Sequence, residues 1–283
     1  MVNSTLAIDR LASLLTNLRS LVVLTGAGCS TSSGIPDYRD QDGNWKNAQP
    51  MQFSNFIAND ENRQRYWKRS LAGWNSFGKA IPNSSHEALV ELERMGVLST
   101  LITQNVDRLH QKAGHENVID LHGRLDLVRC IQCDTEVSRD DYQKNMLDVN
   151  SQYRDWLETT YDAKFNRAPD GDSHIFDPNI ELKIIPCSSC GGVLKPDVVF
   201  FGESVPKDVV THAFACVDES EMLLVVGSSL MVYSGFRFCR YAAKNGKPVV
   251  IIGYGKTRGD ELASLKITGE CGAILKTLIE QMV

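Results

Sequence analysis

The sequence lacks a long apolar run. Its longest ones, such as residues 222–226 and 248–252, have the length of a strand, whereas a membrane-spanning helix needs about 20 apolar residues. A block of like charge is also missing, since 30 Lys and Arg are balanced by 35 Asp and Glu. We therefore expect no membrane partner and no nucleic-acid partner. Nothing in the sequence indicates an oligomer, so a monomer is the default.

A secretion or transit signal is lacking as well. Residues 1–20 contain Asp9 and place five leucines at mostly helical spacing, namely Leu6, Leu11, Leu14, Leu15 and Leu18. This pattern predicts a folded helix rather than a cleaved peptide. We expect a cytoplasmic protein.

The cysteines are numerous, and a chain without a secretion signal uses them as thiols or metal ligands rather than as disulfides. Four of the eight form two Cys-x-x-Cys pairs: Cys130, Cys133, Cys187 and Cys190. Two such pairs supply the four thiolates of a structural, tetrahedral Zn²⁺ site, whereas a redox site would need only one pair. Residues 134–186 separate the pairs, which indicates an insertion between the two halves of the zinc site.

Four segments have the apolar pattern of parallel strands buried on both faces: 21–28, 98–105, 222–230 and 248–255. Helical patterns lie between several of them. One spans residues 84–96, where Ser84 and Glu87 match a capping box and Gly96 ends the helix. Alternating strands and helices predict the α/β class, with a doubly wound, Rossmann-like parallel sheet whose ligand binds beyond the carboxyl ends of the strands.

The cysteine pairs interrupt this alternation. We therefore predict a Rossmann-like domain from residues 1–45, 84–122 and 195–283, and a smaller inserted zinc-ribbon domain from 123–194. Within the insertion, residues 161–182 have the Pro, Gly and Asp content of a long loop. Residues 46–83 read as a helical region that caps the crevice.

The turn after the first predicted strand lacks the third glycine of a dinucleotide fingerprint. Gly26 and Gly28 occupy the first two positions, but Thr31 fills the third and Pro36 interrupts a long helix. Residues 45–50 also lack the acidic residue that a hydride-transferring dehydrogenase places about 20 residues on. A dinucleotide bound in a different way is the better interpretation.

Polar residues follow the second strand. Gln104, Asn105 and Asp107 carry amide and carboxylate groups that can bind ribose hydroxyls, and His122 lies just before the first cysteine pair. A histidine near its ordinary pKa can accept a proton at neutral pH.

These segments together resemble the sirtuins, the NAD-dependent protein deacylases, over nearly the whole chain. The resemblance rests on GAGCSTSSGIPDYR at 26–39, TQNVDRLH at 103–110, LHG at 121–123, KPDVVFFGE at 195–203, GSSL at 227–230 and the two cysteine pairs. GIPDYRDQDG, APDGD and GSSLMVYSGFRF are most similar to class II sirtuins, the group of mitochondrial sirtuin 4 and its bacterial relatives. A bacterial cytoplasmic member is the simplest fit.

The resemblance implies an NAD site with two halves. One half comprises Gly26, Ala27, Gly28, Ser30, Ile35, Asp37, Tyr38, Arg39, Gln104, Asn105 and Asp107, and the other Gly227, Ser228, Ser229, Gly253, Tyr254, Gly255 and Cys271. It also implies a reaction in which the acyl-lysine oxygen attacks the ribose carbon as nicotinamide leaves. His122 acts as general base, with Asn105 and Asp107 beside it, and the product is O-acyl-ADP-ribose.

The acylated-lysine protein would bind by adding its backbone as a strand against Val198, Val199, Phe200, Phe201 and Gly202. Tyr66 and Arg69 have the Tyr-x-x-Arg spacing that holds an acidic acyl carboxylate in some sirtuins, and we expect activity on acidic acyl groups. The alternative is that Tyr66 packs in the core and Arg69 is a surface charge. The resemblance also allows lipoyl removal, and protein mono-ADP-ribosylation in the same cleft is the alternative activity.

Overall fold

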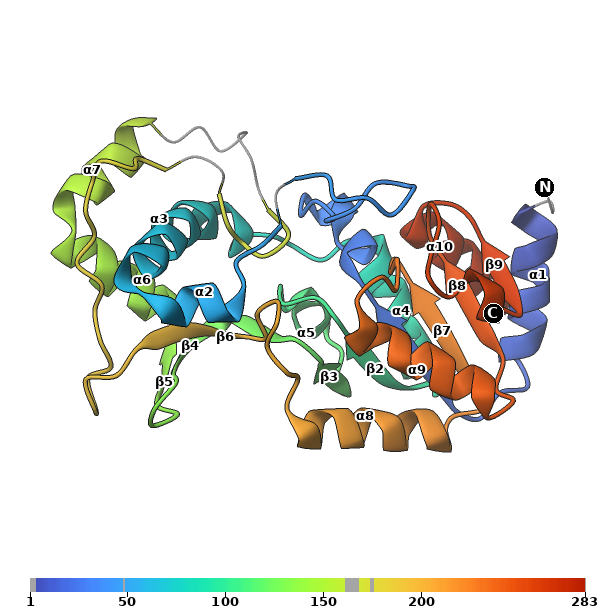
Figure 1. The fold of residues 1–283 in the computed structure, drawn as a ribbon. Helices are drawn as coiled ribbons and strands as arrows, with labels where there is room; N and C mark the ends of the chain where they lie inside the picture. The colour runs from blue at the N-terminus through green and yellow to red at the C-terminus, as the bar shows by residue number, and fades with distance from the viewer. Residues whose placement is uncertain (1–3, 48, 161–167, 174–175, 283) are drawn as a thin grey trace.

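The computed structural model describes residues 4–47, 49–160, 168–173 and 176–282 (Figure 1). Six strands form one parallel sheet in the order β3-β2-β1-β7-β8-β9. They are β1 Leu21–Thr25, β2 Leu98–Thr103, β3 Val118–Asp120, β7 Met222–Val226, β8 Val249–Ile252 and β9 Leu265–Ile267. The four predicted strands are confirmed. β3 and β9 were not predicted because three residues are too few to show a pattern.

The strand order reverses beside β1. From β1 the chain builds outward through β2 and β3, and it then returns to the other side of β1 with β7, β8 and β9. Loops that leave the carboxyl ends of β1 and β7 therefore diverge, and the crevice between them is where ligands of such sheets bind.

Helices cover both faces of this sheet, which explains why β1 is buried throughout and apolar up to Thr25. Val23 packs into the core formed with α1 Ser4–Leu15, α4 Ser84–Arg94 and α10 Cys271–Met282. Val22 and Leu24 point the opposite way, into the core formed with α8 Lys207–Glu219 and α9 Tyr233–Lys244. The doubly wound α/β fold is thus confirmed (Figure 1).

The helix predicted within residues 1–20 is confirmed as α1, but only some of its leucines are buried. In α1 the buried face is formed by Ala7, Ile8, Leu11, Ala12 and Leu15, whereas Leu6 and Leu14 are 66% and 38% exposed. Positions 7, 11 and 15 follow the helical repeat, and an alanine serves at the first of them.

The helix α4 begins with a different cap from the one predicted. The capping residue is Asn83 rather than Ser84: its side chain accepts a hydrogen bond from the Ser85 amide at 2.8 Å, and Nδ1 of His86 accepts one from the Asn83 amide at 3.2 Å. Asparagine caps helices as well as serine does, so the pattern shifts by one residue. Gly96, in the left-handed conformation with φ +72°, follows the helix as predicted.

A smaller antiparallel sheet lies at the other end of the molecule (Figure 1). Its order is β5-β4-β6, with β4 Gly123–Cys130, β5 Glu136–Ser138 and β6 Leu194–Val198. Four helices pack with it around a core that includes Trp67, Tyr142 and Val128: α2 Phe53–Ala58, α3 Asp60–Phe77, α6 Arg139–Val149 and α7 Ser151–Thr160. The helical region predicted at 46–83 therefore shares the core of the cysteine-bearing unit.

The domain boundaries themselves stay a prediction. β6 begins at the predicted boundary and pairs with β4, and the short helix α5 Leu109–Ala113 follows the polar end of β2. Residues 161–167 and 174–175 of the predicted long loop lie outside the described residues. Among the described residues, no helix combines the length and apolar character that crossing a bilayer requires.

Candidate active site

A cavity of about 850 Å³ opens at the carboxyl ends of the central strands. Most of the residues predicted for NAD, substrate and catalysis line it: Gly26, Ala27, Gly28, Ser30, Ile35, Asp37, Tyr38, Arg39, Tyr66, Gln104, Asn105, Asp107, His122, Val198, Val199, Phe200, Phe201, Gly202, Gly227, Ser228, Ser229, Gly253, Tyr254 and Cys271. Gly255 and Arg69 are not among the lining residues. The fold thus gathers residues that lie far apart in the sequence.

The glycine turn after β1 is shaped by its contact with β7. The Gly28 amide donates to the Gly227 carbonyl at 2.8 Å, and a Cβ added at Gly26 or Gly28 would meet Ser228 or Gly227 at 2.8 to 2.9 Å. These glycines therefore allow two loops to touch backbone to backbone. The position of the missing third glycine lies in a short 3₁₀ turn, where the Thr31 hydroxyl donates to the Gly28 carbonyl at 3.1 Å.

A hydrogen-bond network fixes the wall beside this turn. Asn105 Nδ2 donates to the Gly26 carbonyl at 3.0 Å and to Ser30 Oγ at 3.1 Å. The Ser30 hydroxyl donates to Asp107 Oδ2 at 2.7 Å, and Asp107 Oδ1 accepts from the Leu109 amide at 2.9 Å. Burial raises the pKa of Asp107. Both carboxylate oxygens are used within the protein, so Asp107 orients the wall.

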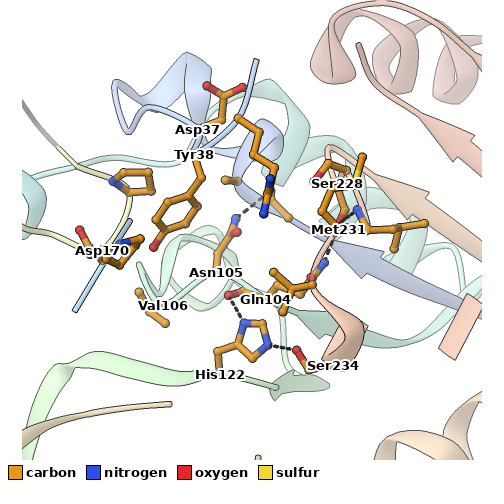
Figure 2. Close-up of a pocket in the computed structure, with 18 of the residues that line it drawn as sticks. Asp37, Tyr38, Gln104, Asn105, Val106, His122, Asp170, Ser228, Met231 and Ser234 are labelled. Carbon is orange, nitrogen blue, oxygen red and sulfur yellow. Dashed lines mark hydrogen bonds between the residues drawn. The ribbon is translucent and has the colours of Figure 1, made fainter. Parts of the chain in front are cut away.

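Gln104 connects three strands at the base of the cavity. Its side-chain amide donates to the Thr25 carbonyl at 3.1 Å and to Ser228 Oγ at 2.7 Å. It therefore ties the ends of β1, β2 and β7 together, and its backbone carbonyl remains directed toward His122 (Figure 2).

His122 is held at both ring nitrogens. Nδ1 lies 3.0 Å from the Gln104 carbonyl oxygen, which can only accept, so Nδ1 carries the proton. Nε2 keeps its lone pair and lies 2.7 Å from Ser234 Oγ, whose hydroxyl donates to it (Figure 2). Burial lowers the pKa of His122 to about 4, and Arg237 contributes to the lowering. His122 is therefore a neutral base at pH 7 on the wall of a cavity.

An aromatic group closes one side of the cavity. Tyr38, Trp45 and Phe201 meet edge to face, with ring centroids 5.6 to 6.1 Å apart. The Arg39 guanidinium lies 4.0 Å from the Trp45 ring centroid and donates to the Gly43 carbonyl. These contacts hold the loop that carries Tyr38 and Arg39, two residues predicted for the NAD site. Trp45 is a lining residue that the sequence did not single out.

Tyr66 and Arg69 do not act together in the cavity. Tyr66 is buried against Phe56 and Phe200 and lines the cavity. Arg69 instead donates from Nε to the Ser173 carbonyl at 3.0 Å and lies 3.5 Å from Asp172 Oδ2. From the segment 168–173, which contacts Arg69, Pro169 and the acidic Asp170 line the cavity (Figure 2 labels Asp170).

The four paired cysteines converge as predicted. The Sγ atoms of Cys130 and Cys190 are 3.5 Å apart, those of Cys133 and Cys187 are 3.6 Å apart, and all four lie within 4.8 Å of one another as free thiols. Zinc–sulfur bonds of about 2.3 Å in a tetrahedron place sulfurs roughly 3.8 Å apart. The residues fit a structural zinc ion, and β4 contributes one of them.

A second group of possible ligands lies behind the glycine turn, where Cys29, His86 and His110 are buried together. His86 Nδ1 accepts the Asn83 amide proton as part of the helix cap. The Nδ1 lone pair is thus used, and a neutral His86 must carry its proton on Nε2, so neither ring nitrogen has a free lone pair for a metal. This group is therefore a buried packing cluster, as expected for structural histidines.

Comparisons with known proteins agree with this geometry. The profile of the Sir2 family matches residues 26–234. A Bradyrhizobium diazoefficiens protein named NAD-dependent protein deacetylase 2 is 50% identical over 280 residues, covering 99% of this chain and all of its own, and a Xanthomonas axonopodis NAD-dependent protein deacetylase is 52% identical over 259 residues, covering 91% and 86%.

Solved structures give the same result. A Sir2 structure with a p53 peptide and NAD⁺ is 29% identical and superposes with a TM-score of 0.73, covering 97% of this chain and 98% of its own. The class II assignment stays a prediction. The match in family profile, sequence and structure shows that this chain belongs to the Sir2 family, the sirtuins.

Proposed function

We propose that this enzyme is an NAD-dependent protein lysine deacylase, which cleaves NAD to nicotinamide and transfers the acyl group of an acylated lysine to ADP-ribose. The observation that carries the proposal is His122, a neutral base whose Nε2 lone pair is held on the wall of the cavity. The names of the relatives support the coarser activity, NAD-dependent protein deacetylation.

The shape of the cavity supports NAD as the co-substrate. Backbone without side chains at Gly26, Gly28 and Gly227 lets a pyrophosphate approach closely, and the next loops offer Ser228 and Ser229. Tyr254 and Cys271 line the same end, where we propose that the adenosine binds. The absence of a dinucleotide-type acidic residue is consistent with a dinucleotide that is cleaved rather than one that exchanges hydride.

In the proposed reaction, the acyl oxygen of the lysine bonds to the ribose carbon as nicotinamide leaves. His122 then accepts at Nε2 the proton of a ribose hydroxyl, whose oxygen attacks the acyl carbon, and a water molecule completes the release of free lysine and O-acyl-ADP-ribose. Asn105, Ser30 and Asp107 hold the wall where the nicotinamide ribose would lie. The aromatic group of Tyr38, Trp45 and Phe201 would exclude water from the reacting atoms. We propose that the substrate backbone adds along 198–202.

For the acyl group, acidic and lipoyl classes remain our proposals. Tyr66 supports an acyl channel, because it lines the cavity. An acidic acyl group would require Arg69 to leave Asp172 and enter the cavity, past the Asp170 carboxylate. If this happens, Arg69→Ala will lower deglutarylation selectively. An equal loss of deacetylation would contradict that role.

A mass-spectrometric panel tests the activity. Purified protein, NAD and one peptide carrying acetyl, glutaryl, hydroxymethylglutaryl or lipoyl groups should yield free lysine in at least one case. ADP-ribose attached to an added protein, with every peptide untouched, would instead assign the alternative ADP-ribosyltransferase activity. We place the reaction in the cytoplasm and leave the monomeric state as a prediction.

A further inference from the structure

Ser234 is the one side chain, among the described residues, whose hydrogen bond to Nε2 of His122 is found in the structure. It lies in the first turn of α9, and Figure 2 shows its hydroxyl directed at the imidazole. Nε2 is the atom at which the proposed reaction deposits a proton, so Ser234 contacts the base at its working nitrogen.

The position of Ser234 is itself fixed. Arg237 Nε donates to the Ser234 carbonyl at 3.0 Å, within the same helix. Gly235 lies so close to Gln104 that an added Cβ would meet Oε1 at 2.4 Å. His122 therefore lies between two elements that contact each other. The Gln104 carbonyl accepts from its Nδ1, the Ser234 hydroxyl donates to its Nε2, and α9 packs against Gln104.

A hydroxyl suits both protonation states of the imidazole. It donates to the Nε2 lone pair of neutral His122, and after rotation about the C–O bond it accepts from Nε2–H of the charged ring. The charged ring would be buried, and the ionised side chain that acts on it is Arg237, which has the same sign. The Gln104 carbonyl stabilises the charged ring at Nδ1, and an acceptor at Nε2 would stabilise it at the other nitrogen.

We propose that Ser234 is a positioning residue for the general base: it holds the imidazole before substrates bind, yields Nε2 to the ribose hydroxyl, and accepts the hydrogen bond from Nε2–H once His122 is protonated. This role rests on the proposed function. An alanine cannot replace the hydroxyl, whereas a threonine can.

The test compares Ser234→Ala and Ser234→Thr with Arg240→Ala, a control at an exposed position on the same helix. In Ser234→Ala we expect kcat for deacylation to fall on the order of tenfold, with KM for NAD unchanged. Ser234→Thr should recover most of the rate. Histidine ¹⁵N NMR of the free protein should show Nε2 of His122 losing its hydrogen bond in Ser234→Ala and keeping it in Ser234→Thr.

An unchanged kcat and an unchanged Nε2 signal in a folded Ser234→Ala protein would overturn the proposal. A loss of rate with a raised KM and a lowered Tm, and no change at Nε2, would reduce Ser234 to a structural role and overturn it as well. A wild-type protein that deacylates no peptide would contradict the proposed function instead, and the NMR signal separates that failure from the first.

Discussion

One hydrogen bond and the burial of the ring determine the chemistry available to His122. The Gln104 carbonyl fixes the proton on Nδ1, and burial keeps the ring neutral by lowering its pKa to about 4. Because the neutral form is the proposed base, we expect activity to be lost as pH falls through the pKa of His122 in the folded protein.

The pH dependence of kcat/KM tests this directly. We expect the acidic limb that belongs to His122 in the free enzyme to lie near pH 4, well below the ordinary value of 6.5. Histidine NMR of the free protein should report the same value. A limb at 6.5 in both measurements would contradict the burial of the ring.

Gly227 is constrained both by its backbone conformation and by a close contact. Its φ is +63°, and an added Cβ would lie 2.4 Å from the Cys29 amide nitrogen. We expect Gly227→Ala to lower the free energy of unfolding by about 3 kcal/mol or more, because backbone strain and a backbone clash add.

Gly246 is the matched control, since its φ is +72° and nothing lies within 4 Å of an added Cβ. Gly246→Ala should cost only about 1 kcal/mol, from the left-handed conformation. Urea-induced unfolding measures the free energy of unfolding of the two variants. Equal losses would show that the contact between the two loops does not constrain Gly227.

Among the helices, α4 begins with a cap that includes a buried histidine. His86 is part of the helix cap, and burial lowers its pKa to about 4. The unfolded chain, with a pKa near 6.5, binds the proton more readily. The contribution of neutral His86 to the free energy of unfolding is therefore fully present above pH 6.5 and is lost as pH falls toward 4.

His86→Gln removes this titration while keeping a side chain that can accept from the Asn83 amide. We expect the free energy of unfolding of the wild type to fall by about 1.4 kcal/mol per pH unit below pH 6.5 for each such histidine. The variant should show a shallower slope by that amount. Parallel slopes from pH 6.5 to 5 would contradict a neutral, buried His86.

The elements also show what the sequence could predict. Strands such as β7 are buried on both faces and apolar throughout, so their pattern is unambiguous. In β4, buried and partly buried residues do not alternate regularly, so its sequence lacks the alternation of apolar and polar residues that predicts a strand. The predicted cap of α4 lies one residue too late, because Asn83 and Ser84 are both good capping residues.

In the whole molecule, the cavity receives residues from both sheets. The strand-end residues follow from the fold class, since the carboxyl ends of neighbouring parallel strands must converge. Ser234 and Asp170 could not be placed in that way, because contacts between distant segments decide where helix starts and loops lie. The prediction for Tyr66 and Arg69 rested on their spacing and its resemblance to some sirtuins, which say nothing of Asp172, the residue that lies 3.5 Å from Arg69 in the structure.

The four-cysteine site is joined to the cavity through a shared core. Cys130 and Cys187 belong to the same core as Tyr66 and Phe200, which line the cavity. We expect Cys190→Ser to lose the bound zinc, lower the Tm and abolish deacylation. Cys190 is exposed, so the substitution alone removes little packing.

Cys216→Ser is the control, because Cys216 lies outside the four-cysteine cluster. It should keep the zinc content and activity of the wild type. Full activity of Cys190→Ser without zinc would show that the metal does not support the cavity.

The central claim is that the acyl group leaves lysine for ADP-ribose with His122 as base. The most direct measurement follows O-acyl-ADP-ribose and free lysine by mass spectrometry in one reaction, with wild type and His122→Ala. We expect the two products in equal amounts, and a rate lower by a factor of about 10² to 10⁴ in the variant. Free lysine without O-acyl-ADP-ribose, or an unchanged rate in His122→Ala, would contradict the account.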